Sequence, residues 1–376
     1  MKKLFARLKR IYQRFLEKKA LIKRRRGTTV FVPDDMCCAV STDKQVTFGI
    51  VGTGHVFDRW MHDAQMLPSS ANIRVKGVCA GRSNAANEKA ARYRIPVVYG
   101  SYEEMLADPE IDAVYVATPN HMHCKNTVQA LNVGKHVLCE KPVAVNTSEL
   151  AEMHRAASDN DCFCMEGMWM RTLPAIRKLQ ELVSNGEIGE VKLVRTSCCN
   201  SNSPENYPAM YSAEKAGGAL MDVGCYGLHF ARLFINAAAD VSAAADVTNG
   251  GVDRTSTITL KTENAVANIT QSIGAAGGAF ASIHGTKGYI EVPMFLSPSE
   301  FTVYNLKGEK KIYKYKTEKE KRPIGYAYEI LEFADCIRSG KRDSKLIPLS
   351  ETVAVAEAME CVRRQCGISL AGEIIK

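Results

Sequence analysis

Hydrophobic positions along the chain follow two different patterns, and the change between them falls near residue 167. From residue 45 onwards, short apolar runs alternate with segments whose apolar residues recur at helical spacing. The apolar runs predict buried strands at 45–52, 73–80, 111–119, 135–141 and 162–167. The segments between them predict helices at 55–67, 84–94, 101–109, 123–134 and 148–160. This alternation predicts a parallel sheet with helices on both faces.

Beyond residue 167 the strands become longer, and their apolar and polar residues alternate. After a helix at 174–186, strands are predicted at 190–199, 256–263, 265–273, 279–285, 288–293 and 301–306. Such alternation is typical of an antiparallel sheet with one buried face. The fold class is therefore α/β: a doubly wound parallel sheet over 45–167, then an α/β domain with an open, mainly antiparallel sheet over 168–376. Helices near 325–339 and 349–364 follow, and we expect a C-terminal helix to pack back on the first domain.

The first 44 residues differ from the rest in charge. Residues 1–26 hold twelve Lys or Arg against Glu17, so they contribute +11 to a formal net charge of +8, and the remainder carries about −3. Apolar residues between Leu4 and Phe15 recur at helical spacing, which predicts a basic amphipathic arm, with a linker at 27–44. A membrane-surface or polyanion role and a solvated arm or oligomer contact both fit this arm. The body shows no basic face for nucleic acid.

Length and cysteine content narrow the class of protein. The chain has 376 residues, enough for two domains, and no apolar run reaches the roughly 18 residues of a membrane span. Its 13 cysteines show no C-x-x-C and no spacing typical of zinc ligands. We therefore expect reduced thiols, a cytoplasmic protein and no metal.

A glycine-rich turn follows the first strand of the parallel sheet. In FGIVGTGHVFDR, Gly52 and Gly54 stand where the strand meets a helix, and Thr53, His55 and Val56 complete the turn. A backbone without side chains lets a pyrophosphate approach the helix N-terminus. The third position of the glycine motif is Phe57 rather than a small residue. In this βαβ setting the turn predicts a dinucleotide-binding Rossmann domain.

The end of the second strand indicates which dinucleotide binds. An NAD site usually has an acidic residue there, whereas this strand ends in Cys-Ala-Gly followed by Arg82 and Ser83. A guanidinium pairs with a 2′-phosphate that a carboxylate would repel. The prediction is NADP, with NAD as the alternative.

Polar residues follow two later strands of the same sheet. Thr118, Pro119, Asn120 and His121 end one strand, and Glu140, Lys141 and Pro142 end the next. Ligands of doubly wound sheets bind beyond the carboxyl ends of the strands, so these residues should border the nucleotide crevice. Pro142 favours extended backbone at Lys141 and directs its side chain towards the crevice.

The second domain offers a further set of proton-transfer groups. If GGALMDVGCYGLHF is helical from about residue 220, Asp222, Tyr226 and His229 lie on one face. In EGMWMRTLP, Trp169 and Arg171 suit a sugar or another polyol, although packing at the domain junction fits them equally well.

These motifs together resemble the Gfo/Idh/MocA family, which includes glucose–fructose oxidoreductase and inositol dehydrogenase. The resemblance covers roughly residues 45–370 and rests on VGTG, ATPNHMH, KHVLCEKP, EGMWMRTLP, GGALMDVGCYGLH and HGTKGYIEV. Tyr226 and the Arg-Ser pair resemble the branch with dihydrodiol dehydrogenase, NADP-dependent xylose dehydrogenase and glucose–fructose oxidoreductase. The resemblance implies an active site between the two domains, with Lys141, Tyr226 and Asp222 matching the family's lysine, tyrosine and aspartate.

The function expected from this resemblance is hydride transfer between a nicotinamide and the carbinol or carbonyl carbon of a sugar, polyol or cyclic diol. The hypothesis is that Lys141 lowers the pKa of Tyr226 or of the substrate hydroxyl, that Tyr226 transfers the proton and that Asp222 orients a neighbouring hydroxyl. His229 is the alternative base. Two other functions compete: a redox-neutral sugar enzyme that retains its nicotinamide, and an NADP-binding regulator without turnover. The family resemblance makes a homodimer, or a higher homo-oligomer, the expected assembly.

Overall fold

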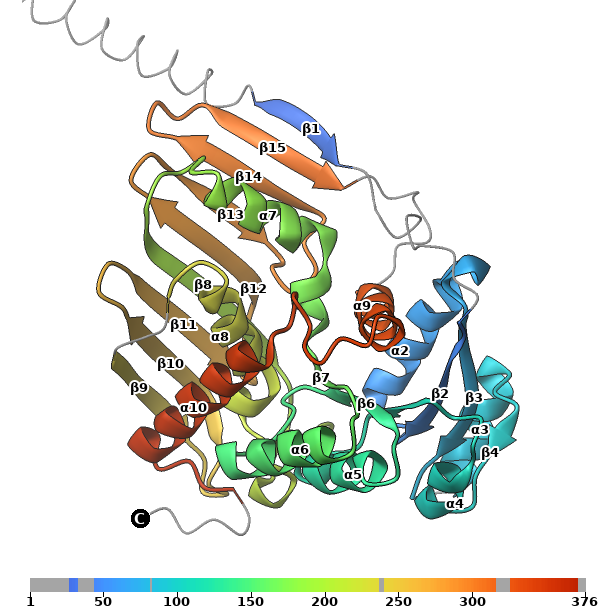
Figure 1. Ribbon diagram of the computed structural model, residues 1–376. Helices are drawn as coiled ribbons and strands as arrows, with labels where there is room; N and C mark the ends of the chain where they lie inside the picture. The colour runs from blue at the N-terminus through green and yellow to red at the C-terminus, as the bar shows by residue number, and fades with distance from the viewer. Residues whose placement is uncertain (1–26, 33–43, 82, 237–239, 316–324, 371–376) are drawn as a thin grey trace, which may run out of the picture.

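The smaller of the two β-sheets has six parallel strands, which confirms the doubly wound parallel sheet (Figure 1). The structure is a computed structural model that describes residues 27–32, 44–81, 83–236, 240–315 and 325–370. The strand order is β4-β3-β2-β5-β6-β7. The strands are β2 (Val46–Val51), β3 (Ile73–Cys79), β4 (Val97–Val98), β5 (Ala113–Val116), β6 (His136–Glu140) and β7 (Cys164–Gly167).

Helices connect these strands, and local sequence explains where several of them begin. Ser101 accepts a hydrogen bond from the N–H of Glu104 at the start of α4, and Asn146 does the same for Glu149 at the start of α6. Phe57, in the third position of the glycine motif, is fully buried in the hydrophobic core. The helices are α2 (His55–Met66), α3 (Ser83–Tyr93), α4 (Tyr102–Ala107), α5 (His123–Leu131) and α6 (Thr147–Asp159), with 3₁₀ turns η2 (Ser69–Ala71) and η3 (Asn120–Met122).

The larger sheet has nine strands in the order β1-β15-β14-β13-β12-β8-β11-β10-β9. Its neighbours pair antiparallel except β1 with β15 and β8 with β11, which confirms a mainly antiparallel sheet. The strands are β1 (Thr28–Val32), β8 (Val191–Ser201), β9 (Asp240–Val247), β10 (Asp253–Lys261), β11 (Val266–Ser272), β12 (Gly274–Gly285), β13 (Gly288–Pro293), β14 (Glu300–Asn305) and β15 (Lys310–Tyr315).

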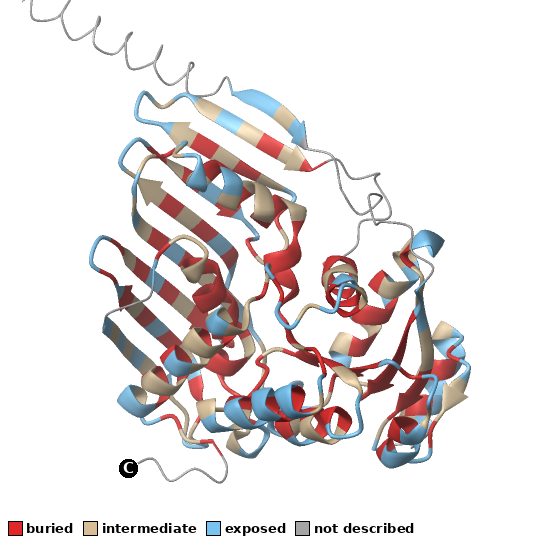
Figure 2. Cartoon of the chain, viewed as in Figure 1, coloured by how far each residue is buried: buried red, intermediate tan, exposed pale blue. Residues whose placement is uncertain are grey.

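Helices cover one face of this larger sheet. Figure 1 shows α7 (Pro174–Ser184), α8 (Cys225–Arg232) and α10 (Leu349–Cys366) on that face. In Figure 2 buried and exposed residues alternate along the strands, as a sheet with one covered face requires. The remaining turns are η4 (Trp169–Thr172), η5 (Pro208–Tyr211), η6 (Ala213–Lys215) and a π-helical turn, η7 (Leu220–Gly224).

Four strands were not predicted from the sequence pattern. β1 lies inside the predicted linker at 27–44, and its register places Thr28 opposite Lys311 on β15. β15 has three lysines among its six residues, β9 is rich in Ala, and β4 has only two residues. β1 pairs with a strand far along the chain, so no local signal marks it. β9 and β15 pair with the neighbouring strands β10 and β14, but Ala and Lys, which are frequent in them, are depleted in strands.

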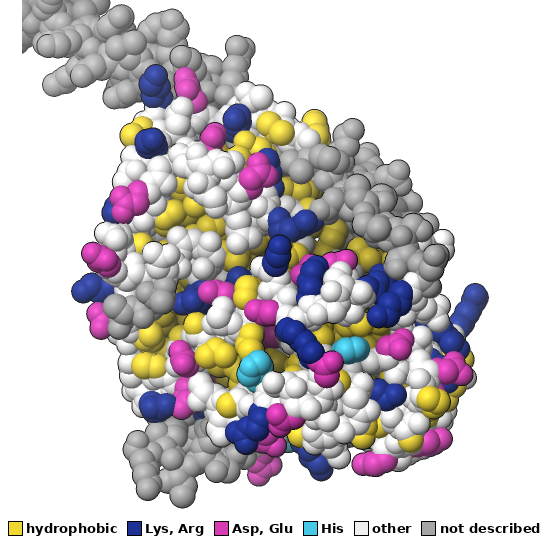
Figure 3. All heavy atoms as spheres, viewed as in Figure 1, with side chains coloured by type: hydrophobic (Ala, Val, Ile, Leu, Met, Phe, Trp, Pro, Cys, Tyr) yellow, Lys and Arg dark blue, Asp and Glu magenta, His cyan; other side chains and the backbone are white. Residues whose placement is uncertain are grey.

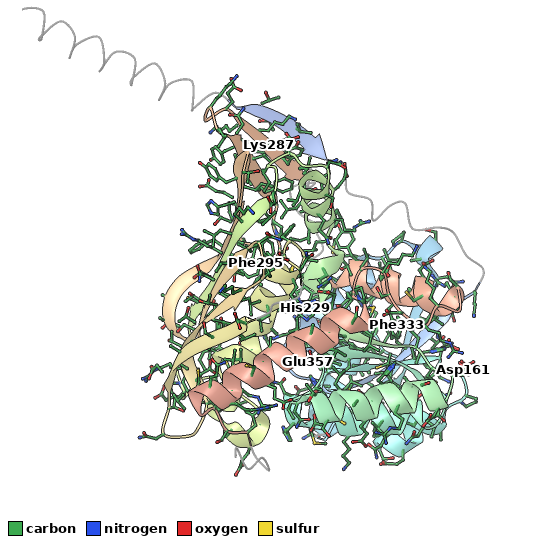
Figure 4. All side chains as sticks on the ribbon, turned by 60° about the vertical axis from the view of Figure 1, so that its left-hand side comes forward. Asp161, His229, Lys287, Phe295, Phe333 and Glu357 are labelled. Atoms are coloured by element: carbon green, nitrogen blue, oxygen red, sulfur yellow. The ribbon has the colours of Figure 1, made fainter. Side chains whose placement is uncertain are left out.

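The helix α9 (Tyr326–Arg338) packs on the parallel sheet although it follows the larger one. The Asp63 carboxylate on α2 accepts the backbone N–H of Gly325 at 2.8 Å and that of Ala327 at 3.3 Å. Phe333, labelled in Figure 4, packs against Phe48 of β2. The division of the chain at residues 167 and 168 stays a prediction, and the arm at 1–26 lies outside the described residues.

Arg338 ties the other end of α9 to the parallel sheet. Its guanidinium donates to the carbonyl oxygens of Ala71 at 2.7 Å, Asn72 at 3.0 Å and Lys44 at 2.9 Å. We expect Arg338→Ala to lower the free energy of unfolding by about 1–3 kcal/mol, because these three backbone carbonyl groups lose their charged hydrogen-bond donor. Arg338→Lys should recover only part of that loss, since an ammonium lacks the fork that reaches three carbonyls. Urea unfolding of both variants measures this, and equal stability of Arg338→Ala and wild type would contradict it.

Glu329 on α9 is a buried acid without a hydrogen-bond partner. Its side chain is fully buried, and neither carboxyl oxygen has a partner among the described residues. Burial raises its pKa well above the ordinary value, and the charges of Glu140 and Asp63 add to the effect. The folded protein therefore keeps a proton that the unfolded chain releases above the ordinary Glu pKa of about 4.3.

Because of this proton, the contribution of Glu329 to the free energy of unfolding decreases as the pH rises. The contribution of protonated Glu329 is fully present below the unfolded pKa and is lost as the pH approaches the folded one. We expect Glu329→Gln to remove this loss, so its stability gain over wild type should grow by up to about 1.4 kcal/mol per pH unit above pH 5. Urea unfolding between about pH 5 and pH 9 measures the slope. The matched control is Glu357→Gln, an exposed glutamate on α10 (Figure 4), and equal slopes for both variants would contradict the account.

The surface agrees with the charge distribution of the sequence. On the face drawn in Figure 3, Lys and Arg side chains are interspersed with Asp and Glu. Within the described ranges, none of the helices has the length and hydropathy needed to cross a membrane.

Candidate active site

A cleft of about 960 Å³ lies at the carboxyl ends of the parallel strands. It contains most of the predicted nucleotide residues, and Ala209 and Asp222 reach it from the other domain. The predicted residues that line it are Gly52, Thr53, Gly54, His55, Val56, Thr118, Pro119, Asn120, Glu140, Lys141 and Asp222. Among the described residues, no group of three His, Cys, Asp or Glu is placed to hold a metal ion.

The glycine turn has the geometry that a pyrophosphate requires. Gly52 has φ of +102°, and a Cβ there would lie 2.3 Å from the carbonyl oxygen of Ala117. A Cβ on Gly54 would meet no atom within 4 Å, so open space lies over the backbone at the start of α2. No side chain caps that helix start, which leaves its N–H groups for an anion. These residues fit a dinucleotide.

The ribose end of the cleft is described in part. Cys79, Ala80 and Gly81 line it at the end of β3, so these three positions bring no carboxylate. Arg82 lies outside the described residues, and although Ser83 begins α3, its side chain is not described. The preference for NADP over NAD therefore stays a prediction.

On the loop after β5, Asn120 lines the cleft as predicted, His121 does not, and a third residue, His123, was missed. Asn120 donates to the carbonyl oxygen of Ala216 at 3.0 Å, which joins the two domains beside the cleft. His121 is exposed and is not among the residues lining the cleft. His123, which sequence reasoning did not select, lines it and is buried. Its ring nitrogens lie 2.9 Å from the carbonyl oxygens of Thr118 and Pro142, so it links the two loops that border the cleft.

Lys141 extends from the end of β6 to the second domain. Its ammonium donates to the carbonyl oxygen of Asp222 at 2.6 Å and to its carboxylate at 3.3 Å. Burial is the largest single effect on Lys141 and opposes its charge, but Asp222 together with Cys225 and Glu140 raises the pKa above the ordinary value. The peptide bond between Lys141 and Pro142 is cis. Lys141 is therefore a charged donor at the cleft.

Glu140 lines the cleft as predicted, and its carboxylate also holds the neighbouring backbone. Its carboxylate accepts from the phenol of Tyr115 at 2.5 Å and from the N–H of Lys141 at 3.1 Å. Burial raises its pKa, which these hydrogen bonds oppose. Glu140 thus fixes the backbone that carries the Lys141 side chain.

Tyr226 lies behind Lys141 rather than on the cleft wall. The Lys141 ammonium is 5.1 Å from the centre of its ring, and the indole N–H of Trp169 donates to its hydroxyl oxygen at 2.8 Å. Burial raises the pKa of Tyr226 well above the ordinary value. The net pKa of Tyr226 is thus raised rather than lowered, because burial and the nearby Glu140 charge dominate, and a lowering of the pKa of the substrate hydroxyl by Lys141 stays a prediction. Trp169 contacts this phenol and is buried away from the cleft lining.

His229 and Arg171 belong to a buried network between the domains. His229 Nε2 lies 3.1 Å from the Glu166 carboxylate, and Figure 4 shows it in the interior behind α10. Arg171 donates to the carbonyl oxygen of Leu346 at 2.9 Å and lies 3.5 Å from the Glu351 carboxylate. Neither residue lines the cleft. The sequence predicted Asp222 and His229 on one face of a regular helix. In the structure the π-helical turn at 220–224 and the burial of α8 place the two side chains in different surroundings.

Comparison with known proteins agrees with the cleft and the two sheets. Residues 46–168 match an oxidoreductase family model with an NAD-binding Rossmann fold, GFO_IDH_MocA, and residues 176–291 match the GFO/IDH/MocA C-terminal domain. The chain is 32% identical over 329 residues to trans-1,2-dihydrobenzene-1,2-diol dehydrogenase of Mus musculus, covering 86% of this chain and 97% of that protein. The Bos taurus enzyme of the same name is 33% identical over 332 residues, with the same coverage.

Solved structures show the same fold. Levoglucosan dehydrogenase in complex with NADH and levoglucosan is 21% identical, has a TM-score of 0.77 and covers 86% of this chain and 97% of its own. A 3-ketoreductase from Actinomadura kijaniata with NADP and TDP-benzene is 22% identical, has a TM-score of 0.76 and covers 86% and 98%. With the glycine turn, the cleft and the matched models of both domains, the chain belongs to the Gfo/Idh/MocA family of NAD(P)-dependent oxidoreductases.

Proposed function

We propose that this protein transfers a hydride between NADP(H) and the carbinol or carbonyl carbon of a diol, sugar or polyol. The observation that carries the proposal is the Lys141 ammonium, held against Asp222 at the cleft where the nucleotide turn opens. A charged donor at this position stabilises the oxyanion that develops when a carbonyl is reduced. Similarity to enzymes named for a dihydrodiol and for levoglucosan supports this substrate class.

Side chains of this chain stabilise the reacting oxygen, orient the substrate and transfer the proton. The nicotinamide supplies or accepts the hydride when it is bound. Lys141 donates to the reacting oxygen, and the Asp222 carboxylate accepts a hydrogen bond from the adjacent hydroxyl. Tyr226, which lies behind Lys141 rather than on the cleft wall, remains a phenol because its pKa is raised, and we propose that it supplies the proton in the direction of reduction. Trp169 already donates to the phenol oxygen, and no described residue accepts from Tyr226, so its own O–H is available.

The test is a turnover assay with both cofactors and a panel of trans-diols, aldoses and polyols. Oxidation of one class with stoichiometric formation of NADPH is the expected result. A nicotinamide that is released only on denaturation, with no net consumption, would instead favour the redox-neutral sugar enzyme. Binding of NADPH without turnover of any member would favour the regulator.

We also propose a homodimer that uses the open face of the larger sheet. Three stacked rings occupy that face: His284 and Tyr289 at 5.7 Å between centroids, then Tyr289 and Tyr304 at 4.5 Å. Phe280 on the neighbouring β12 is 52% exposed. Large exposed apolar side chains favour contact with a partner. We expect light scattering to give twice the chain mass, and Tyr289→Glu to give monomers, whereas a monomeric wild type would contradict this.

The proposed compartment is the cytoplasm. Eleven cysteines lie in the described part of the chain, and all are free thiols. Free thiols in this number favour a reducing environment.

A further inference from the structure

The segment that carries Asp222 and Tyr226 is held at its start by a residue from the larger sheet. This segment begins with the π-helical turn η7 and continues into α8, and its N-cap residue Ala219 provides no side-chain cap. Instead, the N–H of Leu220 donates to both carboxylate oxygens of Asp253, at 3.2 and 2.9 Å. Asp253 is the first residue of β10 and is fully buried.

Two further buried side chains hold this carboxylate in place. The Ser256 hydroxyl donates to Asp253 at 2.5 Å, and the Gln271 amide donates to Ser256 at 2.8 Å. Ser256 and Gln271 are 2% and 0% exposed. Burial raises the pKa of Asp253, and the hydrogen bonds from Ser256 and Leu220 oppose this. We call Asp253, Ser256 and Gln271 the cap network.

The glycine pair before Asp222 fits this contact. Gly218 has φ of +106°, and a Cβ there would lie 2.4 Å from a carboxylate oxygen of Asp253. A side chain at 218 would push the carboxylate away from Leu220. Gly218 therefore permits the close approach on which the cap depends.

The cap has consequences for the proposed active site. Asp222 is two residues beyond Leu220, and it accepts both hydrogen bonds from Lys141, which belongs to the other sheet. The contact between Lys141 and Asp222 thus joins the two domains. Asp253 holds the backbone two residues before Asp222, at the N–H of Leu220. A π-turn departs from regular helix geometry and frequently marks a functional site.

We propose that Asp253 is a positioning residue that holds η7 and α8 on the larger sheet, so that Asp222 and Tyr226 face Lys141. The effect on turnover rests on the proposed function, but the effect on Lys141 does not. Asp253 is not among the residues that line the cleft.

The experiment measures how readily the Lys141 amine reacts with acetic anhydride in the protein without added cofactor, followed by mass spectrometry of its peptide. In wild type the contact with Asp222 protects the amine. We expect Asp253→Ala to increase the labelling rate about tenfold, because that contact loosens. Asp253→Asn keeps one acceptor for Leu220 and should stay near the wild-type rate. Ser256→Ala should give an intermediate rate.

A matched control exists at another helix start. Asp343 accepts the N–H of Leu349 at the start of α10 at 2.9 Å, and neither residue lines the cofactor cleft. Asp343→Ala should leave Lys141 labelling unchanged. In turnover, Asp253→Ala should lower kcat about a hundredfold with little change in the Kd for NADPH, because misplacement by about 1 Å has that scale of effect.

A folded Asp253→Ala variant with the wild-type labelling rate at Lys141 would overturn the inference, whatever its kcat. If Asp253→Ala does not fold, Ser256→Ala decides, and labelling equal to wild type overturns the inference in the same way. If wild type turns over no substrate, the proposed function fails, while the labelling of Lys141 still decides the role of Asp253.

Discussion

Replacing Lys141 by methionine is expected to lower kcat by about a thousandfold while the protein stays folded. The ammonium is the charged donor that borders the cleft beside Asp222, and methionine keeps the length of the side chain without the charge. Its removal takes away the stabilisation of the developing oxyanion, whereas the glycine turn that receives the pyrophosphate is unchanged. NADPH affinity should therefore change much less than kcat.

The matched control for this variant is Lys135, which lies just before the other end of β6. Like Lys141, it donates to backbone oxygen: its ammonium lies 2.9 Å from the carbonyl oxygen of Asp108 and 2.8 Å from that of Ile111. Lys135→Met should lose stability but keep the kcat of its folded fraction. Steady-state kinetics and NADPH titration of both variants give the comparison. If the kcat of Lys141→Met stayed within threefold of wild type, Lys141 would have no role in stabilising the oxyanion, and the proposed mechanism would be contradicted.

Tyr226→Phe is expected to lower kcat by about a hundredfold in the direction of reduction, because the phenol is the proposed proton donor. It should also cost about 1–2 kcal/mol of stability, since the buried indole N–H of Trp169 loses its acceptor. Trp169→Phe breaks the same hydrogen bond but leaves the phenol in place. It should lose stability and keep kcat within about tenfold of wild type.

Comparison of Tyr226→Phe with Trp169→Phe separates the role of the phenol in proton transfer from its role in packing. Full activity of Tyr226→Phe would contradict the proposed role and would leave proton transfer to Lys141. His229 is the weaker alternative, because its Nε2 lies 3.1 Å from the Glu166 carboxylate, whereas the ring of Tyr226 lies beside the Lys141 ammonium.

Residues at strand ends were predictable because their placement follows from local rules. Gly52, Asn120 and Lys141 each follow a buried apolar run, and parallel strands bring their carboxyl ends to one edge. The family resemblance implied the site between the domains, whereas hydrophobic periodicity predicted the two sheets.

Features that depend on contacts between distant segments were not predictable. Asp222 and His229 share a face in an ideal helix, but the π-helical turn and the burial of α8 direct them to different surroundings. The raised pKa of Tyr226 depends on burial that no spacing reveals. Asp253 lies 33 residues from Leu220, and only the folded sheet brings them together.

The central claim is that the cleft binds a nicotinamide dinucleotide for hydride transfer, and a fluorescence titration of the purified protein with NADPH and NADH tests it most directly. We predict saturable binding of NADPH that Arg82→Ala weakens at least about tenfold, with little effect on NADH, because the guanidinium would pair with the 2′-phosphate. Binding of neither dinucleotide, together with no nicotinamide in the supernatant of denatured protein, would contradict the claim.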